Sequence, residues 1–290
     1  MGAPSVSILL RSFNEAWALR DTIAALKAQT FRDWELIAFD SGSTDGSVDL
    51  IRRFGPARFI QLQPHEYRPG RVLNQGMELC RHDRMICLNA DATPQSSEWL
   101  EPLVRALDDP RTAAVFGRQV PRPNCAAAFA RDYDRCYGPN RESGRWPHFF
   151  SMVSSGLRKD VWSRRGFDES MQYSEDEEYT RWCRSEGYQI RYIPDSVVMH
   201  SHNYSPAQAY RRSFGEAWAT AGMERPGARA NGGAVALGWA RDLLGDLRFC
   251  ARTGRLREWA AAARLRWNQR LGRRDGFRAG WRMHAIDQVL

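Results

Sequence analysis

The stretch MICLNADATP, residues 85–94, joins a short apolar run to a polar turn. Its first four residues predict a buried strand, and Pro94 is expected to end the pairing because proline has no backbone N–H. Asp91 would then follow the C-terminal end of a strand, at the edge where open α/β sheets bind ligands. Its carboxylate could hold a divalent cation against phosphate groups, since such cations prefer oxygen ligands. Alternatively, Asp91 caps a helix that begins near Ser96.

Short apolar runs and helical spacing alternate around this stretch. The residues before it predict strands at 5–10, 34–39 and 58–62 and helices at 16–29, 47–54 and 72–80. The residues after it predict helices at 100–107 and 177–186 and strands at 113–119, 189–193 and 197–200. Residues 121–147 are rich in Asn, Arg and Pro and are expected to form loops. The regular alternation in the first part is typical of βαβ units, which predicts an α/β fold with a parallel sheet.

The positive charge is concentrated near the end of the chain. Residues 201–290 contain 16 Arg, no Lys and 7 acidic residues, whereas the first 200 residues are close to neutral. This region has helical spacing and could meet nucleic acid or an anionic membrane surface. Arg-rich helices also occur without an anionic partner. Because the region has no recognisable nucleic-acid module, nucleic acid is not expected as a partner.

The composition predicts a globular protein of the cytoplasm. Hydrophobic residues make up 43% of the chain and charged residues 26%, which argues against disorder. We find no apolar run long enough for a membrane span and no signal-peptide pattern at the N-terminus. The six cysteines stand singly, without the paired spacing of a metal site, and are expected to be reduced thiols.

Four further motifs occur in a fixed order with LNADATP (88–94). They are VSILLRSFNE (6–15), FDSGSTDGS (39–47), YSEDEEYTRW (173–182) and VVMHSHNYS (197–205). Together the motifs resemble the family 2 glycosyltransferases, which have the GT-A fold. The strings RVLNQG (71–76), FGRQVP (116–121) and GFDE (166–169) are similar to the rhamnosyltransferase-like branch of that family. The resemblance covers about the first 205 residues.

The resemblance implies a division of the chain. A GT-A catalytic domain, with a Rossmann-like and mostly parallel sheet flanked by helices, would cover residues 1–204. Its nucleotide-binding half would span about 1–95 and its acceptor half about 96–204. Residues 205–290 would form a basic α-helical extension.

The resemblance also implies roles for single residues on the donor side. The loop after the first strand would lie against the nucleotide, Asp40 would recognise its base, and Asp91 would bind the metal and the diphosphate. The residues concerned are Phe13, Asn14, Glu15, Asp40, Ser41, Asn89 and Asp91. Two of them depart from the family pattern, because many relatives have Asp at the positions of Asn89 and Ser41. Asn89 removes a negative charge from the metal region, which leaves tight metal binding in question.

Two more donor-side candidates follow the third predicted strand. Arg71 could bind a diphosphate through two parallel N–H groups, and Asn74 lies one helical turn further on. The alternative is that Arg71 is an ordinary surface residue at a helix start.

The later motifs supply candidates for the metal and for the acceptor side. In the resemblance, Asp176 matches the general base that takes a proton from the acceptor hydroxyl, with Glu175 beside it. His200 matches the histidine that completes the metal site in many members, and His202 is a second candidate. The metal would be Mg²⁺ or Mn²⁺. Trp146 belongs to an aromatic patch that could face the acceptor sugar, although core packing is the more frequent fate of such patches.

These expectations combine into one main hypothesis. The chain would be an inverting glycosyltransferase that uses a dTDP- or UDP-sugar, with rhamnose as a candidate sugar. Its acceptor would be a saccharide or a lipid-linked glycan in cell-surface polysaccharide assembly. The C-terminal helices, which carry Trp239, Trp259 and Trp267, could lie on the inner face of the cytoplasmic membrane, pack on the catalytic domain or form a homodimer. The alternative function is a sugar-nucleotide-binding protein without turnover, which Asn89 makes plausible.

Overall fold

The computed structural model describes residues 5–223 and 232–287, which form two compact units. The α/β unit consists of the chain up to Val120, Tyr137–Ser170 and Glu175–His200. The helical unit consists of Pro121–Cys136, Met171–Ser174 and the chain from Ser201. The expected domains 1–204 and 205–290 include residues 1–4, 224–231 and 288–290, which lie outside the described part. That division stays a prediction.

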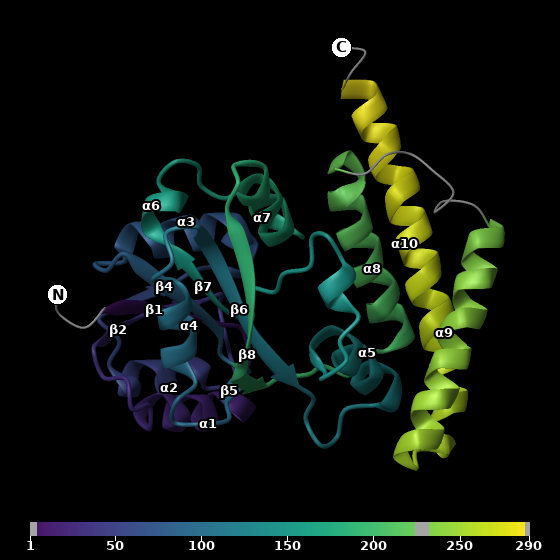
Figure 1. Cartoon of the computed structure of the whole chain (residues 1–290), viewed down its shortest axis with the longest axis horizontal. Helices are drawn as coiled ribbons and strands as arrows, with labels where there is room; N and C mark the ends of the chain where they lie inside the picture. Colours follow the sequence, from purple (N-terminus) through teal and green to yellow (C-terminus); the bar gives the residue numbers. More distant parts are fainter. Residues whose placement is uncertain (1–4, 224–231, 288–290) are drawn as a thin grey trace. The chain divides into compact units, whose positions relative to one another are not determined.

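The first half of the α/β unit has the expected alternation of strands and helices (Figure 1). Its elements are β1 (Val6–Ser12), α1 (Ala16–Lys27), β2 (Trp34–Asp40), α2 (Ser47–Phe54), β3 (Arg58–Gln61), the short helix η1 (Pro64–Glu66), α3 (Pro69–Leu79) and β4 (Arg84–Asn89). Helix α3 begins three residues before the predicted start because Pro69 occupies its first turn, where the fixed φ of proline favours a helix. Figure 1 shows α1 and α2 below the strands and α3 above them.

The second half adds strands on the other side of β4. Its elements are β5 (Thr93–Pro94), α4 (Leu100–Ala106), β6 (Thr112–Val120), the short helix η2 (Ser143–Arg145), β7 (Ser154–Arg158), α6 (Lys159–Trp162), α7 (Glu175–Ser185) and β8 (Gln189–Met199). The eight strands form one sheet in the order β3-β2-β1-β4-β7-β6-β8-β5. The pairs β3–β2, β2–β1, β1–β4 and β6–β8 are parallel, and the remaining three are antiparallel. The fold class is therefore α/β with a mixed sheet.

The structure corrects two expectations about strands. Pro94 does not end the pairing, because Thr93 and Pro94 form β5 opposite Met199 and Val198. Proline is tolerated there because β5 is at the edge of the sheet, where one side of the strand needs no partner. The two strands expected at 189–193 and 197–200 are one strand, β8, which is interrupted by an irregularity in its register with β6.

Residues 121–147 are not all loop. They contain α5 (Ala127–Tyr137), whose small and aromatic residues pack in the helical unit. Strand β7 was also not expected from the sequence. It lies between β4 and β6 and makes both pairs antiparallel.

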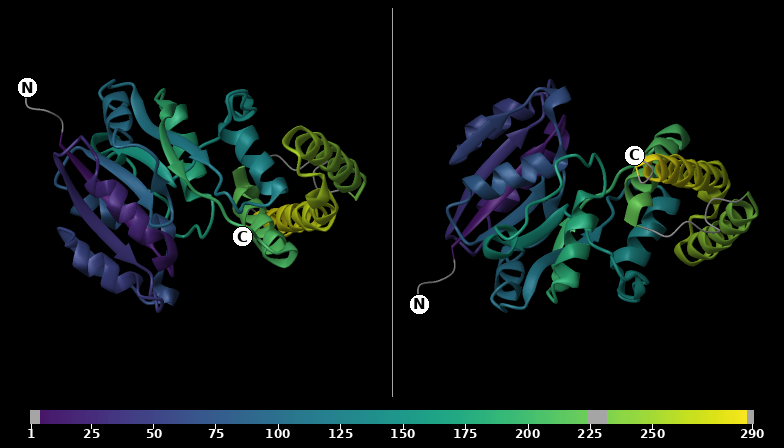
Figure 2. Two further views of the ribbon diagram at one scale, coloured as in Figure 1. Left: turned by 90° about the horizontal axis from the view of Figure 1, so that it is seen from below. Right: turned by 90° about the horizontal axis from the view of Figure 1, so that it is seen from above.

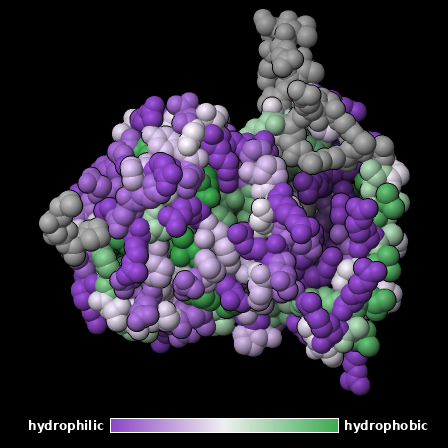
Figure 3. All heavy atoms as spheres, in the orientation of Figure 1, coloured by the Kyte–Doolittle hydropathy of each residue, from purple (hydrophilic) through white to green (hydrophobic). Residues whose placement is uncertain are grey.

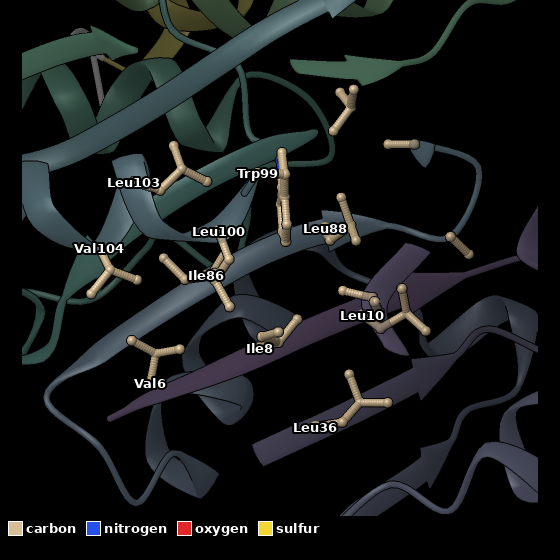
Figure 4. Packing of buried hydrophobic residues seen from close by; sticks show 14 of the residues in the cluster. Val6, Ile8, Leu10, Leu36, Ile86, Leu88, Trp99, Leu100, Leu103 and Val104 are labelled. Atoms are coloured by element: carbon tan, nitrogen blue, oxygen red, sulfur yellow. The ribbon is translucent and has the colours of Figure 1, made fainter. Parts of the chain in front are cut away.

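The main core of the α/β unit lies between the sheet and the helices α1, α2 and α4. Figure 4 shows Trp99 among the side chains of Leu88, Leu100 and Leu103, with Ile8 of β1 nearby. The Trp99 ring is fully buried, and its Nε1–H donates to the Ser154 hydroxyl at 3.0 Å. This bond connects α4 to β7 and satisfies the one polar group of the ring.

Three long helices dominate the helical unit (Figure 2). They are α8 (Pro206–Thr220), α9 (Gly232–Thr253) and α10 (Trp259–Asp287), with the short helices η3 (Ala221–Met223) and η5 (Leu256–Glu258) after α8 and α9. Helices α8 and α10 approach closely at Gly272, Gly276 and Gly280 of α10. A Cβ atom at Gly276 would lie 2.3 Å from the Phe214 carbonyl oxygen of α8. Only glycine permits this backbone approach.

Two tryptophans that were candidates for a membrane surface form hydrogen bonds within the helical unit, and their contact with a membrane stays a prediction. Trp239 Nε1 of α9 donates to the Ala263 carbonyl of α10 at 2.8 Å. Trp259 Nε1 of α10 donates to the Leu243 carbonyl of α9 at 2.9 Å. Trp267 is 39% exposed. In the described part of the chain, none of the helices combines the length and the hydropathy that crossing a bilayer requires.

Candidate active site

The candidate site lies where the order of the parallel strands reverses. Strands β1, β2 and β3 follow one another in one direction, whereas β4 pairs with the opposite side of β1. Such a reversal leaves a crevice at the C-terminal ends of the two central strands. The last paired residues of β1 and β4 are Arg11 and Asn89. Both line a pocket of about 270 Å³.

The pocket is built mainly from three loops. Its lining residues are Arg11, Ser12, Phe13, Glu15, Ser41, Pro64, Tyr67 and Asn89. Four of the expected donor-side residues therefore line the pocket: Phe13, Glu15, Ser41 and Asn89. A fifth, Asn14, lies between Phe13 and Glu15 in the chain. The Phe13 side chain is 50% exposed. An exposed ring beside polar groups is suited to stack on a planar ligand such as a nucleotide base.

Hydrogen bonds join the loop after β1 to the loop after β2. Asn14 adopts a left-handed backbone conformation with φ of 56°, which asparagine tolerates better than most residues. Its N–H donates to Ser43 Oγ at 2.7 Å, and its Oδ1 accepts from the Thr44 N–H at 2.8 Å. The Glu15 N–H donates to Ser47 Oγ at 3.0 Å. These bonds fix the wall of the pocket, so the Asn14 side chain shapes the site.

Asp40 is fully buried at the end of β2 and is occupied by its own turn. Its Oδ1 accepts from the N–H groups of Gly42 and Ser43, at 3.0 and 2.8 Å, and its Oδ2 accepts from the Ser43 hydroxyl at 2.6 Å. These contacts are those of an ordinary turn between a strand and a helix. The role of Asp40 in recognising a base stays a prediction.

Glu15, which lines the pocket, interacts electrostatically with a second carboxyl group, that of Asp91. Burial, together with the charge of Asp91, raises the pKa of the Glu15 carboxyl to about 8. Asp91 itself is fully buried. It does not cap a helix, because α4 begins at Leu100 and its N-cap residue is Trp99. The negative charge of the Asp91 carboxylate would favour an approaching cation.

His200 lies beside Asp91 in an orientation suited to metal binding. Its Nε2 atom is 3.5 Å from Asp91 Oδ2, and both side chains are buried. Its Nδ1 atom lies 2.9 Å from Gln119 Oε1. The Gln119 amide donates to the hydroxyls of Tyr137 and Ser151, at 2.7 and 2.8 Å, so its carbonyl oxygen is turned to the ring. The Nδ1 atom therefore donates to Gln119, and the Nε2 atom is turned toward Asp91.

This arrangement fits a divalent cation. One carboxylate and one imidazole offer ligand atoms within 4.8 Å of each other. A histidine ligand whose second nitrogen is held by a carbonyl group is the usual pattern at metal sites. His202, the other expected ligand, follows two residues later and belongs to the helical unit, where its ring stacks on Tyr204. Its role at the metal stays a prediction.

Asp176 lies in the first turn of α7, next to the buried Glu175. Burial raises the pKa of the Asp176 carboxyl, while the Glu177 N–H bonded to it at 2.8 Å and the charge of Arg11 oppose the rise. The Arg11 guanidinium in turn interacts electrostatically with both Glu175 and Asp176. A carboxylate with a raised pKa is a better proton acceptor than an exposed one.

Two predicted donor residues are engaged outside the pocket. Arg71 is half exposed and pairs with Glu169, with Nε 3.3 Å from Oε2. The Asn74 amide donates to the Phe167 carbonyl and to Glu169 Oε1, both at 3.0 Å. Its Oδ1 accepts from Trp162 Nε1 at 2.9 Å and from the Phe167 N–H at 2.8 Å. These contacts tie α3 to the loop at 166–169.

Trp146 is partly exposed and packs edge to face on Phe149, with 5.4 Å between the ring centroids. Phe149 and Phe150 both pack edge to face on Phe116 of β6. Most of this aromatic patch is therefore core packing. The acceptor role of Trp146 stays a prediction.

Residues 7–166 match the sequence model of the family described as "Glycosyl transferase family 2". The matched part is more than half of the chain and contains the pocket and Asp91. The chain is a family 2 glycosyltransferase.

Relatives and solved structures agree with this family. The glycosyltransferase is 27% identical to the O-antigen chain rhamnosyltransferase RfbN of Salmonella typhimurium over 72% of this chain and 70% of the relative. It is 28% identical to the O-antigen chain rhamnosyltransferase WbaN of Salmonella anatum over 73% and 70%. Its fold is similar to a mannosyltransferase of Pyrobaculum calidifontis in complex with GDP-Man and Mn²⁺, at a TM-score of 0.62 and 20% identity, covering 99% and 90% of the two chains.

Several residues of the glycosyltransferase site were not assigned from the sequence: Arg11, Ser12, Pro64 and Tyr67 of the pocket, and Gln119 beside His200. Arg11 is a charged residue in the largely buried strand β1. Because charged residues are rare in buried strands, its presence alone could have suggested a functional role. Gln119, which orients His200, lies in the FGRQVP string. Its neighbours in the sequence do not indicate this role, because the contact with His200 depends on the pairing of β6 with β8.

Proposed function

We propose that the glycosyltransferase moves a sugar from a nucleoside-diphosphate sugar to a hydroxyl of a saccharide or lipid-linked glycan, with inversion of configuration. The pocket at the end of β1 and β4, beside the buried Asp91–His200 pair, is the observation that carries the proposal. A pocket with an exposed ring in its lining, near a carboxylate–imidazole pair that could bind a cation, suits a nucleotide that carries a diphosphate. The family match supports turnover over the alternative of a non-catalytic binding protein.

Asp176 is the proposed general base. Its carboxylate would remove the proton from the acceptor hydroxyl, whose oxygen then attacks the anomeric carbon from the face opposite the diphosphate. The bond from that carbon to the diphosphate oxygen breaks, and the nucleoside diphosphate leaves. The burial of Asp176 and its raised pKa support this role.

Asp91 and His200 are the proposed metal ligands, with His202 as a further candidate. Mg²⁺ or Mn²⁺ would supply positive charge for the departing diphosphate. Gln119 would hold the His200 ring in the orientation that binding requires.

The donor is proposed to be a dTDP- or UDP-sugar, with rhamnose as the favoured sugar. The names of the two Salmonella relatives, both rhamnosyltransferases of the O-antigen chain, support rhamnose and an acceptor in cell-surface polysaccharide assembly. We also propose a cytoplasmic location with peripheral contact to the inner membrane face, where a lipid-linked acceptor would be found.

The experiment is a donor screen followed by a single substitution. Thermal-shift measurements with UDP- and dTDP-sugars, each with and without Mn²⁺ or Mg²⁺, identify the donor, because a ligand that binds the native state raises the melting temperature. We expect Asp176→Asn to lower the transfer rate by about 10²- to 10⁴-fold and to leave donor binding unchanged. The control is Glu177→Gln, one residue further on, whose carboxylate pairs with Arg181. Donor binding without transfer or hydrolysis by the wild type would contradict the proposal.

A further inference from the structure

Arg11 is a half-buried cation in the pocket that the proposed chemistry has not yet used. It stands at the last position at which β1 pairs with β4, opposite Asn89. Among the described residues that line the pocket, it is the one with a positive charge. The charges of Glu175 and Asp176 act on Arg11, and the charge of Asp91 acts on the nearby Glu15, whose raised pKa of about 8 leaves it mostly protonated at neutral pH. An incoming diphosphate would meet repulsion there unless a cation compensates its charge.

The partner of Arg11 orients its guanidinium without neutralising it. Arg11 Nη2 donates to Asn89 Oδ1 at 2.8 Å. The amide oxygen of asparagine accepts a hydrogen bond but carries no formal charge. An aspartate at the same distance would form an ion pair with Arg11. Asn89 therefore leaves the positive charge of Arg11 available in the pocket.

Arg11 also has spare hydrogen-bonding capacity. Its Nε atom is buried and has no hydrogen-bond partner within residues 5–223 and 232–287. A guanidinium has five N–H groups in a planar fork that matches two phosphate oxygens. A buried donor without a partner is costly, and a ligand that supplies the acceptor removes that cost.

We propose that Arg11, held in place by Asn89, binds the diphosphate of the donor. This inference rests on the proposed function and deepens it. Asn89 is then a positioning residue for a cationic side chain, and its departure from the acidic family pattern leaves Arg11 without an ion-pair partner at this position. Restoring an acidic residue at position 89 would weaken the diphosphate site.

The test measures binding of inorganic pyrophosphate, UMP and UDP by calorimetry, in EDTA so that no metal takes part. dTMP and dTDP replace the uridine nucleotides if the wild type prefers them. We expect Arg11→Met to weaken pyrophosphate and UDP binding about tenfold or more and UMP binding less, because charge-assisted hydrogen bonds to phosphate are strong. Arg11→Lys, which keeps the charge but loses the fork, should have an intermediate effect.

Asn89→Asp is the decisive variant, because it preserves the size and shape of the side chain. We expect it to weaken pyrophosphate and UDP binding in the same direction as Arg11→Met. The matched control is Arg105→Met, an arginine of α4 whose side chain is 75% exposed and pairs with Glu101. Equal or tighter binding of pyrophosphate and UDP by Asn89→Asp in EDTA overturns the inference, and so does a wild type that binds neither ligand.

Failure of the proposed function gives a different result. If the wild type binds pyrophosphate in an Arg11-dependent manner but binds no nucleotide, the role of Arg11 as an anion-binding residue holds and the sugar-nucleotide function does not. Circular dichroism of each variant checks that the fold is intact. If Arg11→Met does not fold, Asn89→Asp still decides the question.

Discussion

The carboxylate of Asp246 in α9 joins three segments of the helical unit. Its Oδ2 and Oδ1 atoms accept from Arg266 Nε and Nη2 of α10, each at 2.8 Å. Its Oδ1 also accepts from Arg131 Nη1 of α5 at 3.0 Å. The Asp246 side chain is completely buried, and that of Arg266 is 5% exposed. We therefore expect Asp246→Ala to destabilise the helical unit strongly.

The size of the effect follows from what each arginine retains. Removing one partner of a buried ion pair costs about 3–5 kcal/mol, because the other charge stays buried without compensation. Arg266 keeps Asp132 at 2.7 Å and the Ala128 carbonyl at 2.8 Å, and Arg131 keeps the Asp242 carbonyl at 3.1 Å. We therefore place the loss at the lower end, about 3 kcal/mol.

Urea unfolding and hydrogen exchange measure this loss. The matched control is Glu101→Ala, which removes an exposed carboxylate that pairs with Arg105 at 2.7 Å and should cost less than about 0.5 kcal/mol. Amide exchange should accelerate in α5, α9 and α10 and stay unchanged in β1 and β4. A loss below about 1 kcal/mol in Asp246→Ala would refute the reasoning, because it would mean that the buried charges find other partners.

Two further predictions concern pH and the membrane. Because Glu15 has a folded pKa of about 8, the native state holds a proton that the unfolded state releases between about pH 4.5 and 8. The unfolding free energy of the wild type should therefore fall by at most a few kcal/mol as the pH rises through this window. Glu15→Gln should abolish this contribution to the fall. Identical pH profiles of the two proteins would contradict the prediction. Hydrophobic residues gather on α9 in Figure 3, where Leu237 and Leu244 are 65% and 56% exposed. We expect Leu237→Glu/Leu244→Glu to abolish flotation of the protein with phosphatidylglycerol vesicles, and equal flotation of variant and wild type would count against membrane contact.

Most of the first ninety residues were predictable because their signals are local. Each strand there is a short apolar run, and each helix carries apolar residues at helical spacing. Strand β7 gave no such signal, because it begins Ser154-Ser155-Gly156. A Cβ atom at Gly156 would lie 2.9 Å from side-chain atoms of Ile86 and Leu107. The small residues are required by neighbours that are far away in the sequence, so no local pattern marks the strand.

The site was predictable in position but less so in its contacts. The resemblance and the strand order together place the loops after β1 and β4 at the crevice. The hydrogen bonds of Arg11 and Gln119 depend on how β1 pairs with β4 and β6 with β8, which a local pattern does not specify. Asp40 has the right chemistry for a ligand contact, yet its three hydrogen bonds go to its own turn.

Much of the C-terminal charge is also explained by packing. Arg266 and Arg131 pair with Asp246, Arg270 pairs with Asp242, and Arg252 pairs with Asp134. The net charge of a region therefore does not by itself identify an anionic partner, because arginines that form ion pairs between helices also contribute to that net charge.

The helical unit has a consequence for synthesis of the chain on the ribosome. Helix α5 packs Ala128 and Phe129 against Ala262 and Leu265 of α10, and Arg266 lies 134 residues after its partner Asp132. At about 5–20 residues per second, Asp132 of α5 is synthesised roughly 7 to 27 seconds before Arg266. During this interval the apolar face of α5 has no α10 to cover it. Chaperone capture during translation should therefore concentrate on residues 127–137.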